Sequence, residues 1–158
     1  MSFITLLGKV YAEELCVSSI IRSILLNYDD DTIWNAFFQL LGDTCRHMDV
    51  LSEIAELLGC DRNQFKEDAL ACLSGMEVGI SEEFVPAVFR EALKWEKYAY
   101  KFYSYMLRYF SENMEKEMDS EVSKKVREKL TTLMEDERKH IGLVEELIAS
   151  HALLRKLR

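Results

Sequence analysis

Two residues that can bind a metal ion, Glu137 and His140, stand three positions apart in the C-terminal part of the chain. An α-helix turns by about 100° per residue, so positions i and i+3 lie about 60° apart on one face. The apolar residues around this pair fall on the same face: Leu130, Leu133, Ile141, Val144 and Ile148. An ionised carboxylate in a buried stripe is costly unless it is paired or bound to a metal. The Glu-x-x-His pair therefore indicates either a metal-ligand pair or a buried structural ion pair.

Three more residues of these chemical types interrupt apolar stripes elsewhere in the sequence. Glu14 and Glu96 each replace one apolar residue in a series of apolar residues spaced by three and four. Thr44 occupies the centre of a third such series, and His47 follows it by three residues. A lone core histidine is more often a hydrogen-bonded structural residue, and a lone glutamate can extend from a helix edge to water. Glu13 is an alternative to Glu14 as the residue that faces inward.

Four long amphipathic segments would have to position these side chains. Apolar residues spaced by three and four predict helices over residues 3–28, 32–58, 81–112 and 120–151. Residues 60–81 break the pattern and predict a crossover made of a short helix and a loop. This connection is long enough to run back along a helix of about 40 Å.

The predicted helix ends rest on capping residues. The aspartates of residues 29–31 offer N-caps for the second helix, and Gly59 suits the position after its last turn. The third long helix starts at Ser81, as an N-cap, or at Pro86, which suits a first turn.

The predicted hairpins bring the polar positions to one level. Glu14 lies about 14 residues before the end of the first helix, and His47 about 15 residues into the second. Glu96 lies about 16 residues before the end of the third helix, and Glu137 about 17 residues into the fourth. If the crossover returns to the starting end, three carboxylates and two imidazoles converge in mid-bundle. One or two divalent metal ions would stabilise such a group.

Length and composition fit a single all-α domain, a four-helix bundle over residues 1–158. The chain has 49% hydrophobic residues, one proline and six glycines, which suits long helices. A net charge of −8 argues against a nucleic-acid partner. The N-terminus does not read as a signal peptide and no stretch approaches 18 apolar residues, so we expect a cytoplasmic protein without a membrane partner.

The four cysteines form no C-x-x-C pair, which excludes a zinc ribbon or rubredoxin-like module that could be recognised from sequence. We expect them to be reduced and to act as small apolar residues. They are Cys16, Cys45, Cys60 and Cys72.

The arrangement resembles the ferritin-like superfamily, nearest the rubrerythrin-type di-iron carboxylate proteins. Residues 95–103, WEKYAYKFY, resemble the E-x-x-A-x-x-F-Y pattern of the family's third helix, and residues 134–140, MEDERKH, resemble its fourth. The first helix fits more loosely, through Glu14 and residues 21–24. The resemblance implies two antiparallel hairpins joined by a long crossover, and iron as the cofactor, with zinc or manganese as alternatives. The metal ligands that it implies are Glu14, His47, Glu96, Glu137 and His140.

The second helix departs from the family pattern at one position. The family has Glu-x-x-His where this chain has Thr44 three residues before His47, so the site is one carboxylate short of balancing two ferrous ions. Asp43 is a possible substitute, because positions i and i+4 are only about 40° apart on a helix. Cys45, on the other flank, is a second candidate.

By this resemblance, the chain is a possible di-iron oxidoreductase that reacts with oxygen or peroxide. Tyr103, two turns from Glu96, would donate a hydrogen bond or an electron, and an external electron donor would be required. The alternatives are a degenerate bundle, with an incomplete or absent metal site, that acts as a binding or regulatory module, and an iron-handling ferroxidase.

Aromatic residues point to all sides of the third long helix. We expect a homodimer interface there, although tyrosines lying on the surface are an equal alternative. The residues concerned are Trp95, Tyr98, Tyr100, Phe102, Tyr103, Tyr105, Tyr109 and Phe110.

Overall fold

A computed structural model of the chain describes residues 2–71, 73 and 85–156. Within these residues the predicted all-α class is confirmed, since every regular element is helical. The elements are α1 (Phe3–Asn27), α2 (Asp31–Leu57), α3 (Arg62–Ala71), α4 (Val85–Asn113), the short 3₁₀ helix η1 (Glu115–Glu117) and α5 (Ser120–Lys156). None of the described helices combines the length and the apolar character needed to cross a membrane.

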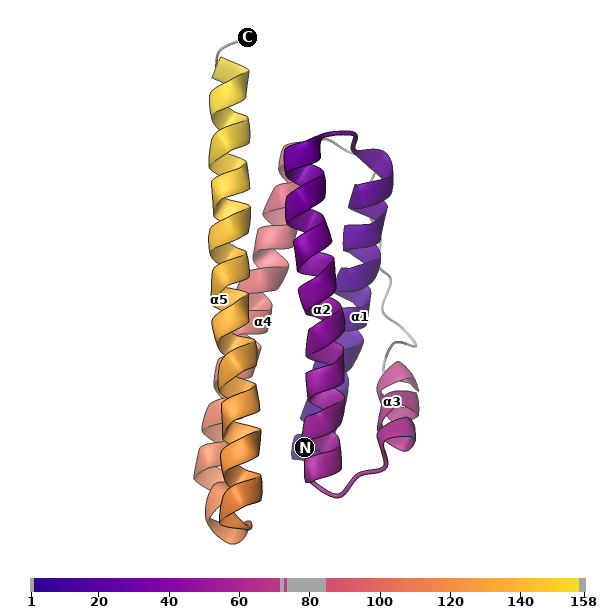
Figure 1. Cartoon of the computed structure of the whole chain (residues 1–158), viewed down its shortest axis with the longest axis vertical. Coiled ribbons are helices and arrows are strands. Elements are labelled where there is room, and N and C mark those ends of the chain that lie inside the picture. Colours follow the sequence, from indigo (N-terminus) through magenta and orange to yellow (C-terminus); the bar gives the residue numbers. More distant parts are fainter. Residues whose placement is uncertain (1, 72, 74–84, 157–158) are drawn as a thin grey trace.

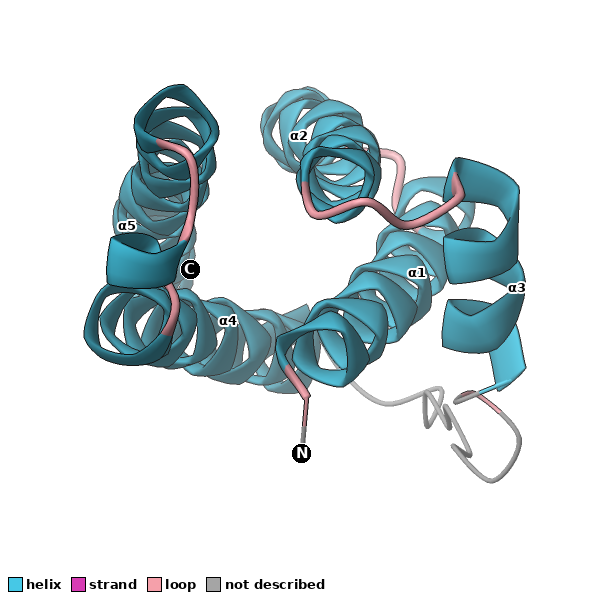
Figure 2. Cartoon of the chain, turned by 90° about the horizontal axis from the view of Figure 1, so that it is seen from below, coloured by secondary structure: helices cyan, strands magenta, loops and turns pink. Residues whose placement is uncertain are grey.

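The four long helices lie side by side as two antiparallel pairs, α1 with α2 and α4 with α5 (Figure 1). Viewed from one end, α2 faces α5 and α1 faces α4, while α3 lies on the outer side of the first pair (Figure 2). α2 ends at one end of the bundle and α4 begins at the other, as a returning crossover requires. The predicted short helix is α3, whereas residues 74–84, with the proposed Ser81 start, lie outside the described residues.

Capping groups set the limits of α2. The Asp30 side chain accepts the backbone N–H groups of the first turn, as the sequence predicted. At the other end, Gly59 has φ +85°, a left-handed conformation that costs glycine little. Its N–H donates to the carbonyl of Glu56, and the N–H of Cys60 donates to that of Ala55. These two bonds satisfy carbonyls that the helix end would otherwise leave unpaired.

The apolar core consists of two clusters separated by a polar layer. The cluster near the α4–α5 turn is built from residues 3–10, 51–55, 103–110 and 126–133. The cluster near the α1–α2 turn is built from residues 21–24, 33–40, 89–92 and 144–147. Between them, all four long helices contribute buried polar residues: Glu14, Thr44, His47, Glu96, Asp136, Glu137 and His140.

Candidate metal centre

The side chain of Glu137 lies between two imidazoles. Its Oε1 is 3.0 Å from Nδ1 of His47, and its Oε2 is 3.6 Å from Nδ1 of His140. Glu14 Oε1 is 3.3 Å from the same nitrogen of His47, and Glu96 Oε2 is 3.3 Å from that of His140. Two triads result, Glu14–His47–Glu137 and Glu96–His140–Glu137, and within each triad one ligand atom per residue lies within 4.8 Å of the others. The two triads share Glu137.

Each long helix contributes through its buried face. Glu137 and His140 project together from α5 because they are three residues apart. On α1, Glu14 is 5% exposed, whereas the neighbouring Glu13 is only half-buried, so Glu14 is the residue that faces inward. His47 from α2 is fully buried. All five residues that were predicted to converge are therefore within one layer.

Aspartates lie near the outer nitrogens of both imidazoles. Asp43 Oδ2 is 3.1 Å from Nε2 of His140, and Asp136 Oδ2 is 3.8 Å from Nε2 of His47. Within the described residues, Nε2 of His47 is a buried polar atom without a hydrogen bond. Arg46 donates to both aspartates at 2.8 and 2.9 Å. A carboxylate on Nε2 favours a proton there and leaves the lone pair of Nδ1 for a metal.

Asp43 lies on a different side of the site from the place that was considered for it. Sequence reasoning offered it as a substitute ligand beside His47, but it contacts His140 from the outer side of the site. Among the described residues, neither Asp43 nor Cys45 belongs to a group of three ligand atoms close enough to share a metal. Sequence reasoning missed Asp136, a 7%-exposed aspartate whose only signal was its place next to Glu137.

The arginine and the lysine nearest the site pair with the aspartates instead of the glutamates. Arg46 holds both aspartates, and Lys139 Nζ is 2.8 Å from Asp136. In the described part of the chain, the three buried glutamates have only imidazoles as cationic partners. Three such carboxylates facing two Nδ1 atoms form a donor set of the kind that holds divalent ions.

Protons occupy this donor set when no metal does. Burial alone lowers the pKa of both imidazoles, but hydrogen bonds to the carboxylates raise it to about 9 for His47 and about 11 for His140. Burial and the nearby Glu137 raise the pKa of Glu96 to about 8, against the opposing effect of His140. Burial also raises the pKa of Glu137, but its hydrogen bonds to His140 and His47 outweigh this and bring it to about 2. Near neutral pH, both imidazoles and Glu96 therefore carry protons that a metal would have to displace.

Tyr103 orients one of the carboxylates. Its fully buried hydroxyl donates to Glu14 Oε1 at 2.6 Å. Burial and the neighbouring carboxylates raise the pKa of Tyr103 well above its ordinary value, so the hydroxyl remains protonated and acts as a donor. The structure thus gives Tyr103 a hydrogen-bonding contact at the site.

We expect Tyr103→Phe to destabilise the metal-free protein by about 1.5–3 kcal/mol, because a buried carboxylate loses a charge-assisted hydrogen bond. Urea denaturation in the presence of a chelator measures the effect. Tyr105→Phe is the matched control, since Tyr105 is 43% exposed and should change stability by less than about 0.5 kcal/mol. Equal effects of the two substitutions would contradict a structural role for the Tyr103 hydroxyl.

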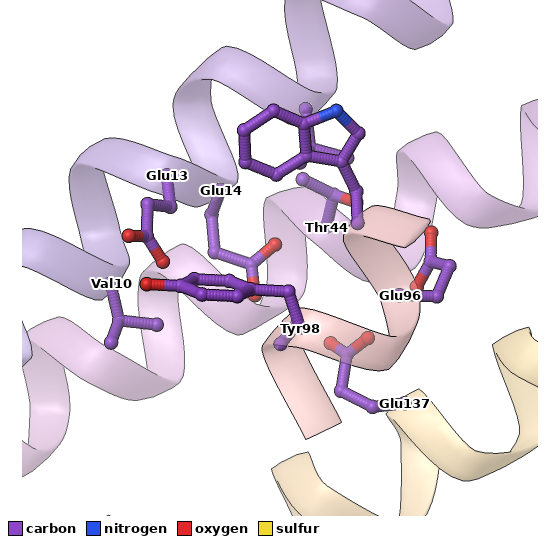
Figure 3. A pocket seen from close by; sticks show the side chains of 10 residues that line it. Val10, Glu13, Glu14, Thr44, Glu96, Tyr98 and Glu137 are labelled. Atoms are coloured by element: carbon purple, nitrogen blue, oxygen red, sulfur yellow. The ribbon is translucent and has the colours of Figure 1, made fainter. Parts of the chain in front are cut away.

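A small cavity of about 20 Å³ reaches the centre from the α1–α4 side. Figure 3 shows Glu14, Thr44, Glu96 and Glu137 around it, with Glu13 and Tyr98 towards one side. Burial and the adjacent Glu14 raise the pKa of Glu13 to about 7. The remaining lining residues are Val10, Val17, Trp95 and Ala99.

Comparisons of the chain with protein-family models, with curated proteins and with solved structures found no match. The ferritin-like resemblance therefore stays a prediction from residues 95–103 and 134–140, and function has to follow from the site itself.

Proposed function

We propose that the protein is a ferritin-like, rubrerythrin-like metalloprotein that binds two iron ions and reduces oxygen or peroxide. The observation that carries this proposal is the position of Glu137, whose two oxygens face the Nδ1 atoms of two separate imidazoles. A structural ion pair needs only one such contact, whereas a shared carboxylate suits two cations held side by side.

The ligands of such a centre would be shared between two ions. Glu14 and His47 would hold one ion, Glu96 and His140 the other, and Glu137 both. The apolar clusters above and below the layer keep bulk water away from it. When bound, two ferrous ions supply two electrons, which with two protons reduce one hydrogen peroxide to two waters.

A partner would have to reduce the oxidised iron ions again after each reaction. The chain has no C-x-x-C pair that could form a rubredoxin-like module, so a separate donor protein would deliver them. Zinc or manganese in the same ligand set would bind without making the protein a peroxidase in this way.

Peroxide consumption by iron-loaded protein tests the proposal. With an added reductant, wild-type protein should turn over peroxide repeatedly, and Glu137→Gln should reduce the rate to that of free iron. Glu145→Gln is a matched control on the same helix, because Glu145 is exposed and pairs with Lys97 at the surface. Protein that holds iron but consumes no peroxide would rule out the enzymatic role and leave iron binding alone.

A binding module is the second candidate, favoured by exposed aromatic rings. Trp34 and Phe38 stack at 5.2 Å near the α1–α2 turn and are 43% and 57% exposed. On α4, the exposed Tyr98 and Tyr105 flank Phe102 in a continuous row of ring contacts. A homodimer that packs along this row would be seen by sedimentation, and a monomer at micromolar concentration would argue against it.

A further inference from the structure

The last turns of α5 extend beyond the rest of the bundle. α5 shares a turn with α4 at the other end, and its 37 residues outnumber the 29 of α4 by eight, which corresponds to about 12 Å. Figure 1 shows this end of α5 passing the α1–α2 turn, and none of the other described helices runs beside it there. Leu147 and Ile148 still pack into the core, whereas Ala149 and Ser150 are exposed. We call residues 149–156 the α5 extension.

The sequence of the α5 extension combines apolar and basic residues. Residues 149–158, ASHALLRKLR, contain three leucines, three basic residues and no aspartate or glutamate, although the whole chain has a net charge of −8. Basic residues suit the last turn of a helix, whose dipole favours them there. The dipole does not account for the leucines, because apolar side chains gain free energy only where they leave water. The composition therefore indicates that the α5 extension packs against a partner.

A surface that complements this composition lies at the α1–α2 turn. We call it the turn surface, and its members are the exposed residues Leu26, Asp29, Asp31, Trp34 and Phe38. Leu26 is 86% exposed and Phe38 57%, so two of its apolar side chains lie mostly in water. Residues 23–38 contain three aspartates and no lysine or arginine. The turn surface is therefore apolar and acidic where the α5 extension is apolar and basic.

A second copy of the chain can bring these two features together. Within one molecule the α5 extension continues straight past the α1–α2 turn and does not fold back over it (Figure 1). A second bundle placed end to end, with its helices running the opposite way, directs its own α5 extension towards this turn. The reach of about 12 Å exceeds the roughly 6 Å of helix between Trp34 and Phe38. Two-fold symmetry makes the same contact twice in one dimer.

We propose that two copies of the chain pair end to end, each docking its α5 extension on the turn surface of the other. Opposite charges meet in this arrangement, and the leucines of one copy cover the exposed apolar side chains of the other. The pairing uses a different surface from a homodimer along the aromatic row of α4. It also requires no bound metal, so it stands or falls separately from the proposed iron centre.

Charge reversal on either side of the contact tests the pairing by sedimentation equilibrium of the 158-residue chain with chelator present. Wild-type protein should form a dimer at micromolar concentration. Asp29→Lys with Asp31→Lys, and separately Arg155→Glu with Lys156→Glu, should each weaken dimerisation at least about tenfold, because like charges then face each other. An equal mixture of the two double variants should regain the dimer, since every contact in it again joins opposite charges.

Two features of the design separate a lost contact from a damaged fold. Asp30 stays unchanged because its side chain caps α2. Lys124→Glu with Lys125→Glu makes the same change of charge on exposed residues at the opposite end of α5, and it should leave dimerisation at the wild-type strength.

Three results would overturn the proposal. The first is wild-type protein that stays monomeric at micromolar concentration, including protein that instead sediments with phosphatidylserine vesicles and so uses its α5 extension on an anionic membrane. The second is a dimer that both double variants leave intact, which would place the interface on another surface. The third is a mixture of the two double variants that remains monomeric.

Discussion

Glu137→Gln is expected to remove both metal ions from the protein, whereas Glu14→Gln and Glu96→Gln each remove one. The reason is that Glu137 belongs to both triads and each of the other two glutamates belongs to one. The amide keeps the size of the side chain but loses the negative charge that binds a divalent ion. The metal content of protein reconstituted with iron in the absence of oxygen, measured by emission spectroscopy, gives the stoichiometry directly.

Two controls distinguish a loss of metal ligands from a loss of folded protein in these variants. Circular dichroism should show the same helical content in all three variants, since glutamine fits the volume of glutamate. Glu145→Gln, an exposed change on the same helix, should retain wild-type metal content. Equal losses in Glu137→Gln and Glu14→Gln would show that the two triads do not share a carboxylate.

The second large effect is a reversal of the pH dependence of stability when metal binds. In the metal-free protein, the pKa values of His47, His140 and Glu96 lie above their ordinary values, at about 9, 11 and 8. The native state therefore binds more protons than the unfolded chain, and stability falls as pH rises. The two imidazoles make their full contribution to the free energy of unfolding below pH 6.5, and this contribution is lost as pH rises through their folded pKa values.

With metal present, stability should rise with pH instead of falling, because the ions displace those same protons and bind more tightly as pH rises. Urea denaturation at pH 6 and pH 8, with chelator or with zinc, measures both slopes. We expect the chelated protein to lose more than about 1.4 kcal/mol between the two pH values, the equivalent of one pKa unit. If the zinc-containing protein loses as much stability between pH 6 and pH 8 as the chelated protein does, His47, His140 and Glu96 are not metal ligands.

Much of the fold could be predicted because its determinants are local. Apolar spacing gave four long helices whose limits agree with the structure to within a few residues where those limits are described. Asp30 and Gly59 cap α2 in the expected way, through contacts within a few residues of the chain. The convergence of polar residues followed from hairpin geometry, which depends only on distances along each helix.

The finer arrangement of the site depends on contacts between helices, which spacing along one helix does not determine. Asp43 was a possible substitute ligand beside His47 on its own helix, but its side chain contacts His140 on α5. Asp136 carries a charge at the edge of an apolar stripe, and it is paired there with Lys139 on its own helix and with Arg46, which approaches from α2. In both cases the decisive contact joins residues about ninety positions apart in the sequence.

Thr44 illustrates how a departure from a pattern can carry information. In the sequence it stands where the ferritin-like pattern predicts a carboxylate. In the structure the same position borders a cavity lined by the three remaining carboxylates. A cavity therefore lies beside the position where the family pattern places a fourth carboxylate.

Anomalous scattering at the iron edge, from crystals of protein reconstituted without oxygen, tests the central claim most directly. We predict two iron positions in the polar layer, one beside Nδ1 of His47 and one beside Nδ1 of His140, with Glu137 between them. A single position, no iron in this layer, or an iron bound at Nε2 of either histidine would contradict the two-metal centre.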